Sequence, residues 1–92
     1  MSVLVSMRFR VRSFHGMEEA IAKYGESIKR SGCNWYRVYR RDLDPQEVLW
    51  LMEFESHEAF ERSSSGFGAD FVDLISPLGE WDDAVWEIAI QS

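Results

Sequence analysis

Two histidines, His15 and His57, are the side chains of this 92-residue chain that most readily exchange a proton near neutral pH. An imidazole at either position could serve as a general base or a metal ligand. Neither has a second histidine, a cysteine or an aspartate at the spacing of a metal-binding pair, so the sequence predicts no metal site. His57 is a candidate catalytic residue. The alternative for both histidines is an exposed position at the end of a helix.

A second candidate set combines guanidinium and carboxylate groups: Arg8, Arg37 and Glu53. The arginines could bind an acidic substrate, such as a carboxylate or an enolate, through paired N–H donors. The structural alternative is a set of ion pairs across a dimer, for example Arg8 with Glu53, because a charge buried between two sheets must be paired. Cys33 lacks the neighbouring base or helix N-terminus that would activate a thiolate, which favours a packing role.

Alternating and helical patterns place these residues on predicted elements. Residues 2–12 alternate with period two, with Val3, Phe9 and Val11 on one side, as in a strand with one buried face. Residues 34–41 and 47–55 predict a hairpin with a turn at Asp44-Pro45. Residues 84–91 alternate again and predict the last strand.

Helical spacing occurs twice between these strands. The first helix is predicted from Met17 to Arg30 with Gly32 as its C-terminal stop, and Gly25 lies inside it at a cost in helix propensity that the sequence does not explain. Ser56 is a predicted N-cap of the second helix. The helical pattern breaks at 63–68 and resumes over 69–78, which predicts either one interrupted helix or two short helices, ended by Pro77 and Gly79. Residues 80–83 are predicted as a loop.

The order β-α-β-β-α-β predicts a single α+β domain over residues 1–92, with the ferredoxin-like arrangement of an antiparallel sheet and two helices on one face. The other face should carry Leu4, Ser6, Arg8 and Arg10 from the first strand. From the third strand, either the set beginning with Val48 and Trp50 or the set beginning with Leu49 and Leu51 lies there. A second copy of the chain would cover this face, so we expect a homodimer.

Composition limits the class of protein. The chain is 46% hydrophobic and 14% aromatic, which is rich for a small monomer and favours association. A net charge of −6 argues against nucleic acid as a partner. No apolar run approaches the roughly 20 residues of a membrane span. One cysteine and the lack of a signal-peptide pattern predict a reducing, cytoplasmic location.

The segment Val48–Phe60, VLWLMEFESHEAF, runs from a hydrophobic strand through an acidic residue and a serine into a helix with Ala-Phe in its first turn. In this segment, and over nearly its whole length, the chain resembles the dimeric α/β-barrel superfamily, in particular its antibiotic-biosynthesis-monooxygenase-like members. The superfamily includes cofactor-free oxygenases of aromatic polyketides, haem-degrading enzymes, isomerases and cyclases. The resemblance implies a dimeric α/β barrel that needs no cofactor, with the ligand between the sheet and the helices.

The resemblance also implies roles for aromatic and amide side chains. Similar monooxygenases use Asn, Trp and Tyr to bind an aromatic substrate and stabilise its anion, which makes Asn34, Trp35 and Tyr36 candidate catalytic residues. Candidate substrate-binding residues are Arg8, Arg37, Glu53, Trp50, Phe67 and Phe71. The alternatives are an ordinary aromatic strand and core packing. Haem-degrading relatives carry a ligand histidine late in the second helical region, and residues 69–78 contain none, which argues against haem.

These observations give one leading functional hypothesis and two alternatives. The leading hypothesis is a cofactor-independent, monooxygenase-like protein acting on a small aromatic substrate of the polyketide or quinol type. The first alternative is a non-catalytic module that binds a small molecule or only dimerises, because the sequence shows no base–nucleophile pair. The second is a polyketide cyclase or isomerase, which would not consume oxygen. Fold alone does not choose between them.

Overall fold

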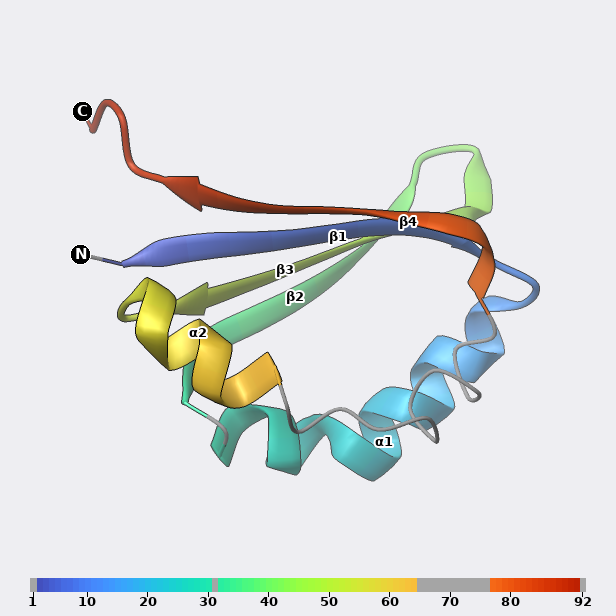
Figure 1. Cartoon of the computed structure of the whole chain (residues 1–92). Coiled ribbons are helices and arrows are strands. Elements are labelled where there is room, and N and C mark those ends of the chain that lie inside the picture. The colour runs from blue at the N-terminus through green and yellow to red at the C-terminus, as the bar shows by residue number, and fades with distance from the viewer. Residues whose placement is uncertain (1, 31, 65–76, 92) are drawn as a thin grey trace.

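The computed structural model describes residues 2–30, 32–64 and 77–91, and Figure 1 shows its strands and helices. The elements are β1 (Val3–Val11), α1 (Phe14–Arg30), β2 (Cys33–Arg41), β3 (Asp44–Phe54), α2 (His57–Ser64) and β4 (Pro77–Glu87). This is the predicted β-α-β-β-α-β order.

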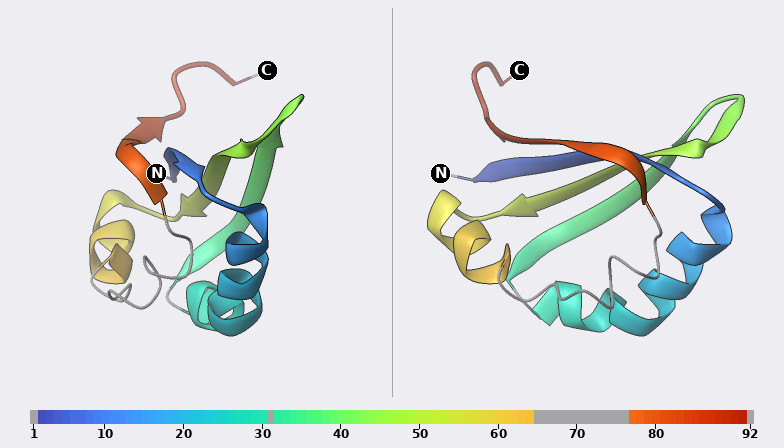
Figure 2. Two further views of the ribbon diagram at one scale, coloured as in Figure 1. Left: turned by 90° about the vertical axis from the view of Figure 1, so that its right-hand side faces the viewer. Right: turned by 45° about the vertical axis from the view of Figure 1, so that its right-hand side comes forward.

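The four strands form one antiparallel sheet in the order β2-β3-β1-β4. Both helices lie on the same face of this sheet, as the views in Figure 2 show from two further directions. The predicted α+β, ferredoxin-like arrangement is therefore confirmed. We call the face toward the helices the inner face, and the opposite face, which the helices leave uncovered, the outer face.

Alternation along the strands assigns side chains to the two faces. On β1, Val3, Val5, Phe9 and Val11 are buried, whereas Arg8 and Arg10 are exposed. On β3, the buried set is Val48, Trp50, Met52 and Phe54. Leu49, Leu51 and Glu53 therefore lie on the outer face, which decides between the two possibilities that the sequence left open. The inner face and α1 residues such as Met17 and Ile28 form the core.

Helix α2 begins as the sequence predicts. The Ser56 hydroxyl accepts a hydrogen bond of 3.1 Å from the backbone N–H of Ala59, and the Ser56 carbonyl accepts one of 3.2 Å from Phe60. These are the bonds of an N-cap residue, which satisfies donors that have no partner inside the helix. Helix α1 begins at Phe14, earlier than predicted, and the Ser13 hydroxyl accepts a 3.3 Å bond from the N–H of His15.

The sequence prediction fails at the start of β4 and at the hairpin. β4 begins at Pro77, so the loop predicted at 80–83 is strand, and Pro77 and Gly79 themselves belong to that strand. Cross-strand pairing with β1, such as Arg8 opposite Asp82, extends the strand through this region. Asp44 and Pro45 belong to β3, and the turn falls at Asp42 and Leu43 instead. β4 ends at Glu87, so residues 88–91 lie outside it.

The predicted helix break at 63–68 and the predicted helix over 69–78 fall mostly on residues 65–76, which lie outside the described residues. Within the described part of the chain, no helix is long and apolar enough to cross a membrane.

Candidate functional site

The inner face holds an aromatic pair formed by neighbouring strands. Tyr36 on β2 lies opposite Met52 of β3, and its ring centroid is 5.9 Å from that of Trp50 at an interplanar angle of 37°. Trp50 is 1% exposed, while Tyr36 is half-buried and packs against the core. Tyr36 therefore presents a phenol on the surface that faces the helices.

Gly25 of α1 explains how this phenol fits beneath the helix. A Cβ atom at position 25 would lie 2.9 Å from the Tyr36 hydroxyl oxygen, closer than real Cβ contacts. Gly25 is buried, and the next nearest atom to that position is Cγ2 of Ile21 at 3.7 Å. The glycine that the sequence left unexplained thus makes room for one oxygen atom. Within the described part of the chain, no hydrogen bond engages that oxygen.

Further aromatic contacts continue along the same layer. Phe9 and Trp81 stack with centroids 4.6 Å apart, and Phe54 lies 5.5 Å from Phe60 of α2. Planar apolar side chains therefore line much of the sheet where it meets the helices. Such surfaces bind aromatic ligands by offset or edge-to-face stacking.

Asn34 and Trp35 do not join Tyr36. The Asn34 side-chain amide donates a 2.9 Å hydrogen bond to Glu53, and the Arg37 guanidinium lies 4.7 Å from the centre of the Trp35 ring. Trp35 and Arg37 lie on the outer face because they pair with Glu53 and Leu51 of the outer set of β3. A register irregularity between Cys33 and Trp35 interrupts the alternation of β2, so Asn34 reaches Glu53 on the same face. The structure therefore separates Asn34 and Trp35 from Tyr36 by the thickness of the sheet.

The predicted substrate-binding residues are divided in the same way. Trp50 lies on the inner face, whereas Arg8, Arg37 and Glu53 lie on the outer face. Within the chain, Arg8 pairs with Glu47 and not with Glu53. Phe67 and Phe71 lie outside the described residues.

Glu47 is the centre of an ion-pair cluster that the sequence did not reveal. Its carboxylate accepts hydrogen bonds from Arg8 Nε at 2.6 Å and from Arg41 Nη1 at 2.9 Å, and Arg10 Nη1 lies 4.0 Å away. The Glu47 side chain is only 11% exposed. Hydrogen bonds from Arg41 and then Arg8 hold the pKa of Glu47 below its usual value. Arg8 and Glu47 are 39 positions apart, so only the strand register joins them.

Both histidines make local contacts on helix surfaces. His57 Nε2 lies 3.1 Å from Glu61, and His15 Nε2 lies 2.8 Å from Glu19, each one helical turn away. The His57 side chain is 59% exposed. Residues 2–30, 32–64 and 77–91 contain no group of three His, Cys, Asp or Glu side chains that could hold a metal ion. These contacts match the surface alternative more closely than a buried base.

Comparison with known proteins places the chain in a family. SnoaB from Streptomyces nogalater, described as a cofactor-independent oxygenase, matches with a TM-score of 0.78 at 16% identity over 98% of this chain and 95% of that one. A dimeric ferredoxin-like protein from an uncultured marine organism matches with a TM-score of 0.72 at 13% identity, over 99% and 98% of the two chains. Rv0793 from Mycobacterium tuberculosis gives 0.69 at 15% identity, over 100% and 99%.

At these identities the likeness to solved structures shows the fold alone. Comparison with curated protein sequences gives no match. The sequence model of the antibiotic biosynthesis monooxygenase family, however, matches residues 2–67, which is most of the chain. The protein therefore belongs to the antibiotic biosynthesis monooxygenase family.

Proposed function

We propose that this protein is a homodimeric, cofactor-independent oxygenase that acts on a small aromatic substrate of the quinol or polyketide type. The substrate would lie against the inner face, at Tyr36 and Trp50. The observation that carries this proposal is the Tyr36 hydroxyl, which Gly25 accommodates under α1 beside a buried tryptophan. Family membership and the likeness to SnoaB support the same class of reaction.

The chemistry requires few protein groups. A phenol or anthrone substrate reacts with oxygen as its anion, so a cofactor-free site must stabilise negative charge on one substrate oxygen. A preorganised hydroxyl donor does this most effectively where water is excluded. Tyr36 would donate to that oxygen, and the rings of Tyr36 and Trp50 would hold the planar substrate. Oxidation of a substrate CH₂ group to a carbonyl consumes one O₂ and releases one water.

The homodimer is proposed to form through the outer face. Leu49 and Trp86 are 36% and 56% exposed there, although both are large and apolar. Leu4 and Leu51 lie between them in the cross-strand register. An apolar face on one side of an antiparallel sheet is commonly covered by the same face of a second copy. The marine neighbour, described as dimeric, supports self-association.

Oxygen uptake with an anthrone and with a dihydroxynaphthalene tests the activity. If the substrate lies on the inner face, Tyr36→Phe should lower kcat by about 100-fold, as expected for the loss of one donor to a developing oxyanion. Tyr39→Phe is the matched control, because Tyr39 lies on the outer face of the same strand. Loss of uptake in Asn34→Ala and Trp35→Ala, with Tyr36→Phe unaffected, would instead place the site on the outer face.

The tryptophans allow binding to be located by face. Trp50 and Trp81 belong to the inner layer, whereas Trp35 lies on the outer face and Trp86 donates a 2.8 Å bond to Ser6 there. Fluorine NMR of protein labelled with 5-fluorotryptophan should show the inner pair shifting on addition of a polyphenol. Such binding without oxygen uptake would favour a non-catalytic module or a cyclase over an oxygenase.

A further inference from the structure

Strand β4, at one edge of the sheet (Figure 1), carries two adjacent aspartates that lie on opposite faces. Asp82 lies opposite Arg8 of β1 and belongs to the outer face. Asp83 lies opposite Met7, which packs against the core. Because residues directly opposite each other in an antiparallel pair share a face, Asp83 belongs to the inner face. A second copy of the chain on the outer face would therefore leave Asp83 uncovered.

The strand register places Asp83 in line with the proposed substrate site. Met7 lies opposite Trp50 of β3 as well, so Asp83, Met7 and Trp50 form one row across the inner face. Tyr36 packs against Trp50 from β2, with the ring centroids 5.9 Å apart. β2 and β4 are three strand spacings apart, about 14 Å, which leaves room for a planar ring system between them. A substrate lying on Trp50 would have the Tyr36 hydroxyl on one side and the Asp83 carboxylate on the other.

The neighbours of Asp83 on its own strand are apolar. Trp81 and Val85, each two positions away, share its face, and Trp81 stacks on Phe9 with ring centroids 4.6 Å apart. Partial burial in these surroundings raises the pKa of the Asp83 carboxyl, and the charge of Asp82 raises it further. A carboxylate with a raised pKa is a stronger base, which suits it to proton abstraction near neutral pH.

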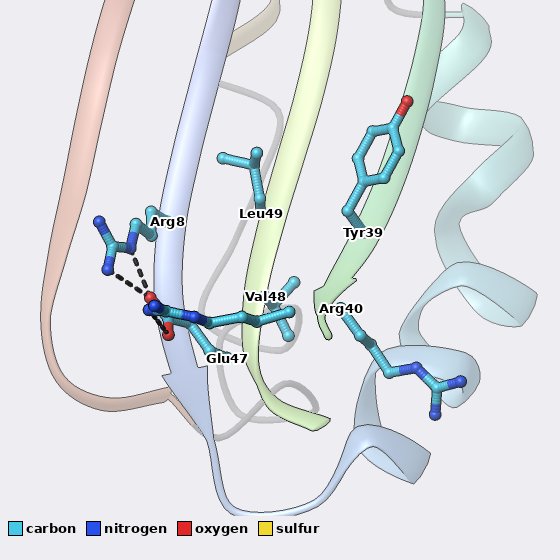
Figure 3. A pocket seen from close by; sticks show the side chains of 7 residues that line it. Arg8, Tyr39, Arg40, Glu47, Val48 and Leu49 are labelled. Carbon is cyan, nitrogen blue, oxygen red and sulfur yellow. Dashed lines mark hydrogen bonds and ion pairs between the residues drawn. The ribbon is translucent and has the colours of Figure 1, made fainter. Parts of the chain in front are cut away.

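The Asp83 carboxylate is not used by the fold. Within residues 2–30, 32–64 and 77–91, no hydrogen bond or ion pair engages it. Glu47 on the outer face differs, because Arg8 binds its carboxylate (Figure 3). The strand beside β4 brings no charge to the inner face, where β1 presents Val3, Val5, Met7, Phe9 and Val11. Asp83 is thus a free carboxylate at the rim of an aromatic surface.

We propose that Asp83 is the general base that removes a proton from the aromatic substrate. This inference rests on the proposed oxygenase function and adds a catalytic residue to it. In an anthrone, a C–H bond of the CH₂ group breaks, its proton passes to an Asp83 oxygen, and the electron pair moves to the carbonyl oxygen across the ring. Tyr36 donates to that oxygen. The step needs no oxidant. After the anion adds O₂, the proton passes from Asp83 to the peroxide anion, which restores the carboxylate.

The adjacent aspartates provide a matched pair of variants. Asp83→Asn should lower kcat for oxygen uptake with 1,8-dihydroxyanthrone by about 100-fold, as expected for the loss of a general base. It should also abolish the acid limb of the kcat–pH profile, over which the rate rises as the carboxyl group loses its proton. Asp82→Asn should retain kcat but move that limb to lower pH, because it removes a charge that raises the pKa of Asp83. Equal effects of the two substitutions would overturn the proposal.

Absorbance under nitrogen separates proton removal from oxidation. Wild-type protein and Asp83→Asn should bind 1,8-dihydroxyanthrone with similar dissociation constants, but only the wild type should convert it to the anion, which absorbs at longer wavelength. Anion formation that is absent from the wild type, or equal in both proteins, would overturn the role of Asp83. The oxygenase proposal would still stand if Tyr36→Phe lowered oxygen uptake. Anion formation that depends on Asp83, without any oxygen uptake, would support the base and refute the oxygenase.

Discussion

Replacing Gly25 with alanine should have opposite effects on stability in two backgrounds. With Tyr36 present, the new methyl group would lie 2.9 Å from the tyrosine hydroxyl oxygen, so the ring or the helix must move. In a Tyr36→Phe background that oxygen is gone. The nearest remaining atom is Cγ2 of Ile21 at 3.7 Å, an ordinary van der Waals contact. Alanine then fits without displacement.

The magnitudes follow from two opposing effects. Alanine in a helix interior is about 1 kcal/mol more favourable than glycine. Overpacking a core contact costs about 1–3 kcal/mol, and here the contact with Trp50 resists movement of the Tyr36 ring. Gly25→Ala alone should therefore lower the free energy of unfolding by up to about 2 kcal/mol, whereas in the Tyr36→Phe background it should raise it by about 1 kcal/mol.

Urea unfolding of the four proteins at one fixed concentration gives the coupling directly, and a fixed concentration removes differences caused by association. The coupling between positions 25 and 36 should equal the overpacking cost. If Gly25→Ala changes the stability equally in both backgrounds, within about 0.5 kcal/mol, the Tyr36 ring swings aside freely. The claim that Gly25 fixes the position of the hydroxyl would then be refuted.

Three further predictions concern single positions. Ser56→Ala removes the N-cap bond of α2 and should cost about 1 kcal/mol of stability, measured by urea unfolding against Ser56→Asp, which retains a capping oxygen. Arg41 and Arg8 depress the pKa of Glu47 in the folded state. The ion pairs should therefore add to the free energy of unfolding above about pH 4.3, the usual pKa of a glutamate, and this stabilisation should be lost as the pH falls through the lower pKa of Glu47 in the folded protein. Glu47→Gln should flatten this part of the acid-unfolding profile, and an unchanged profile would show that the ion pairs do not stabilise the fold. Burial raises the pKa of the Cys33 thiol, so iodoacetamide should label the native protein far more slowly than the urea-unfolded chain, and equal rates would contradict its burial.

Local sequence signals predicted the elements whose stabilising contacts are local. The alternation of β1, the cap at Ser56 and the two strands of the hairpin could all be read from neighbouring residues. β4 was misplaced because Pro77 and Gly79 are typical of helix ends, whereas pairing with β1 decides their conformation. The observed turn contains Leu43 and precedes the predicted Asp44-Pro45 turn. Leu43 adopts a φ of 66°, a conformation that is uncommon for a leucine, so the sequence does not predict it.

The sequence named the residue types of the candidate site, but not which of them share a face, because strand pairing between distant residues decides that. Trp35 and Tyr36 are adjacent in sequence, and adjacent residues of a strand point to opposite faces. Trp35 therefore could not share a site with Tyr36 inside one chain. Alternation alone would place Asn34 on the face of Tyr36, but an irregularity in the strand register between Cys33 and Trp35 places it with Glu53 on the outer face. The Arg8–Glu47 pair depends on the register between β1 and β3, where Arg8 lies opposite Leu49 and reaches diagonally to Glu47. No local pattern encodes that register.

The strand order places opposite charges on the two edges of the sheet. β2 at one edge carries arginines and no acidic residue, and β4 at the other edge carries acidic residues and no basic one. Two such sheets stacked face to face can be related by a twofold axis along the strands or across them. Only the axis along the strands sets β2 of one copy over β4 of the other, so that opposite charges meet at both edges. Attraction between these oppositely charged edges should make association stronger at low ionic strength. Sheets that stack face to face lie about 10 Å apart, which is within a Debye length, and added salt screens the attraction.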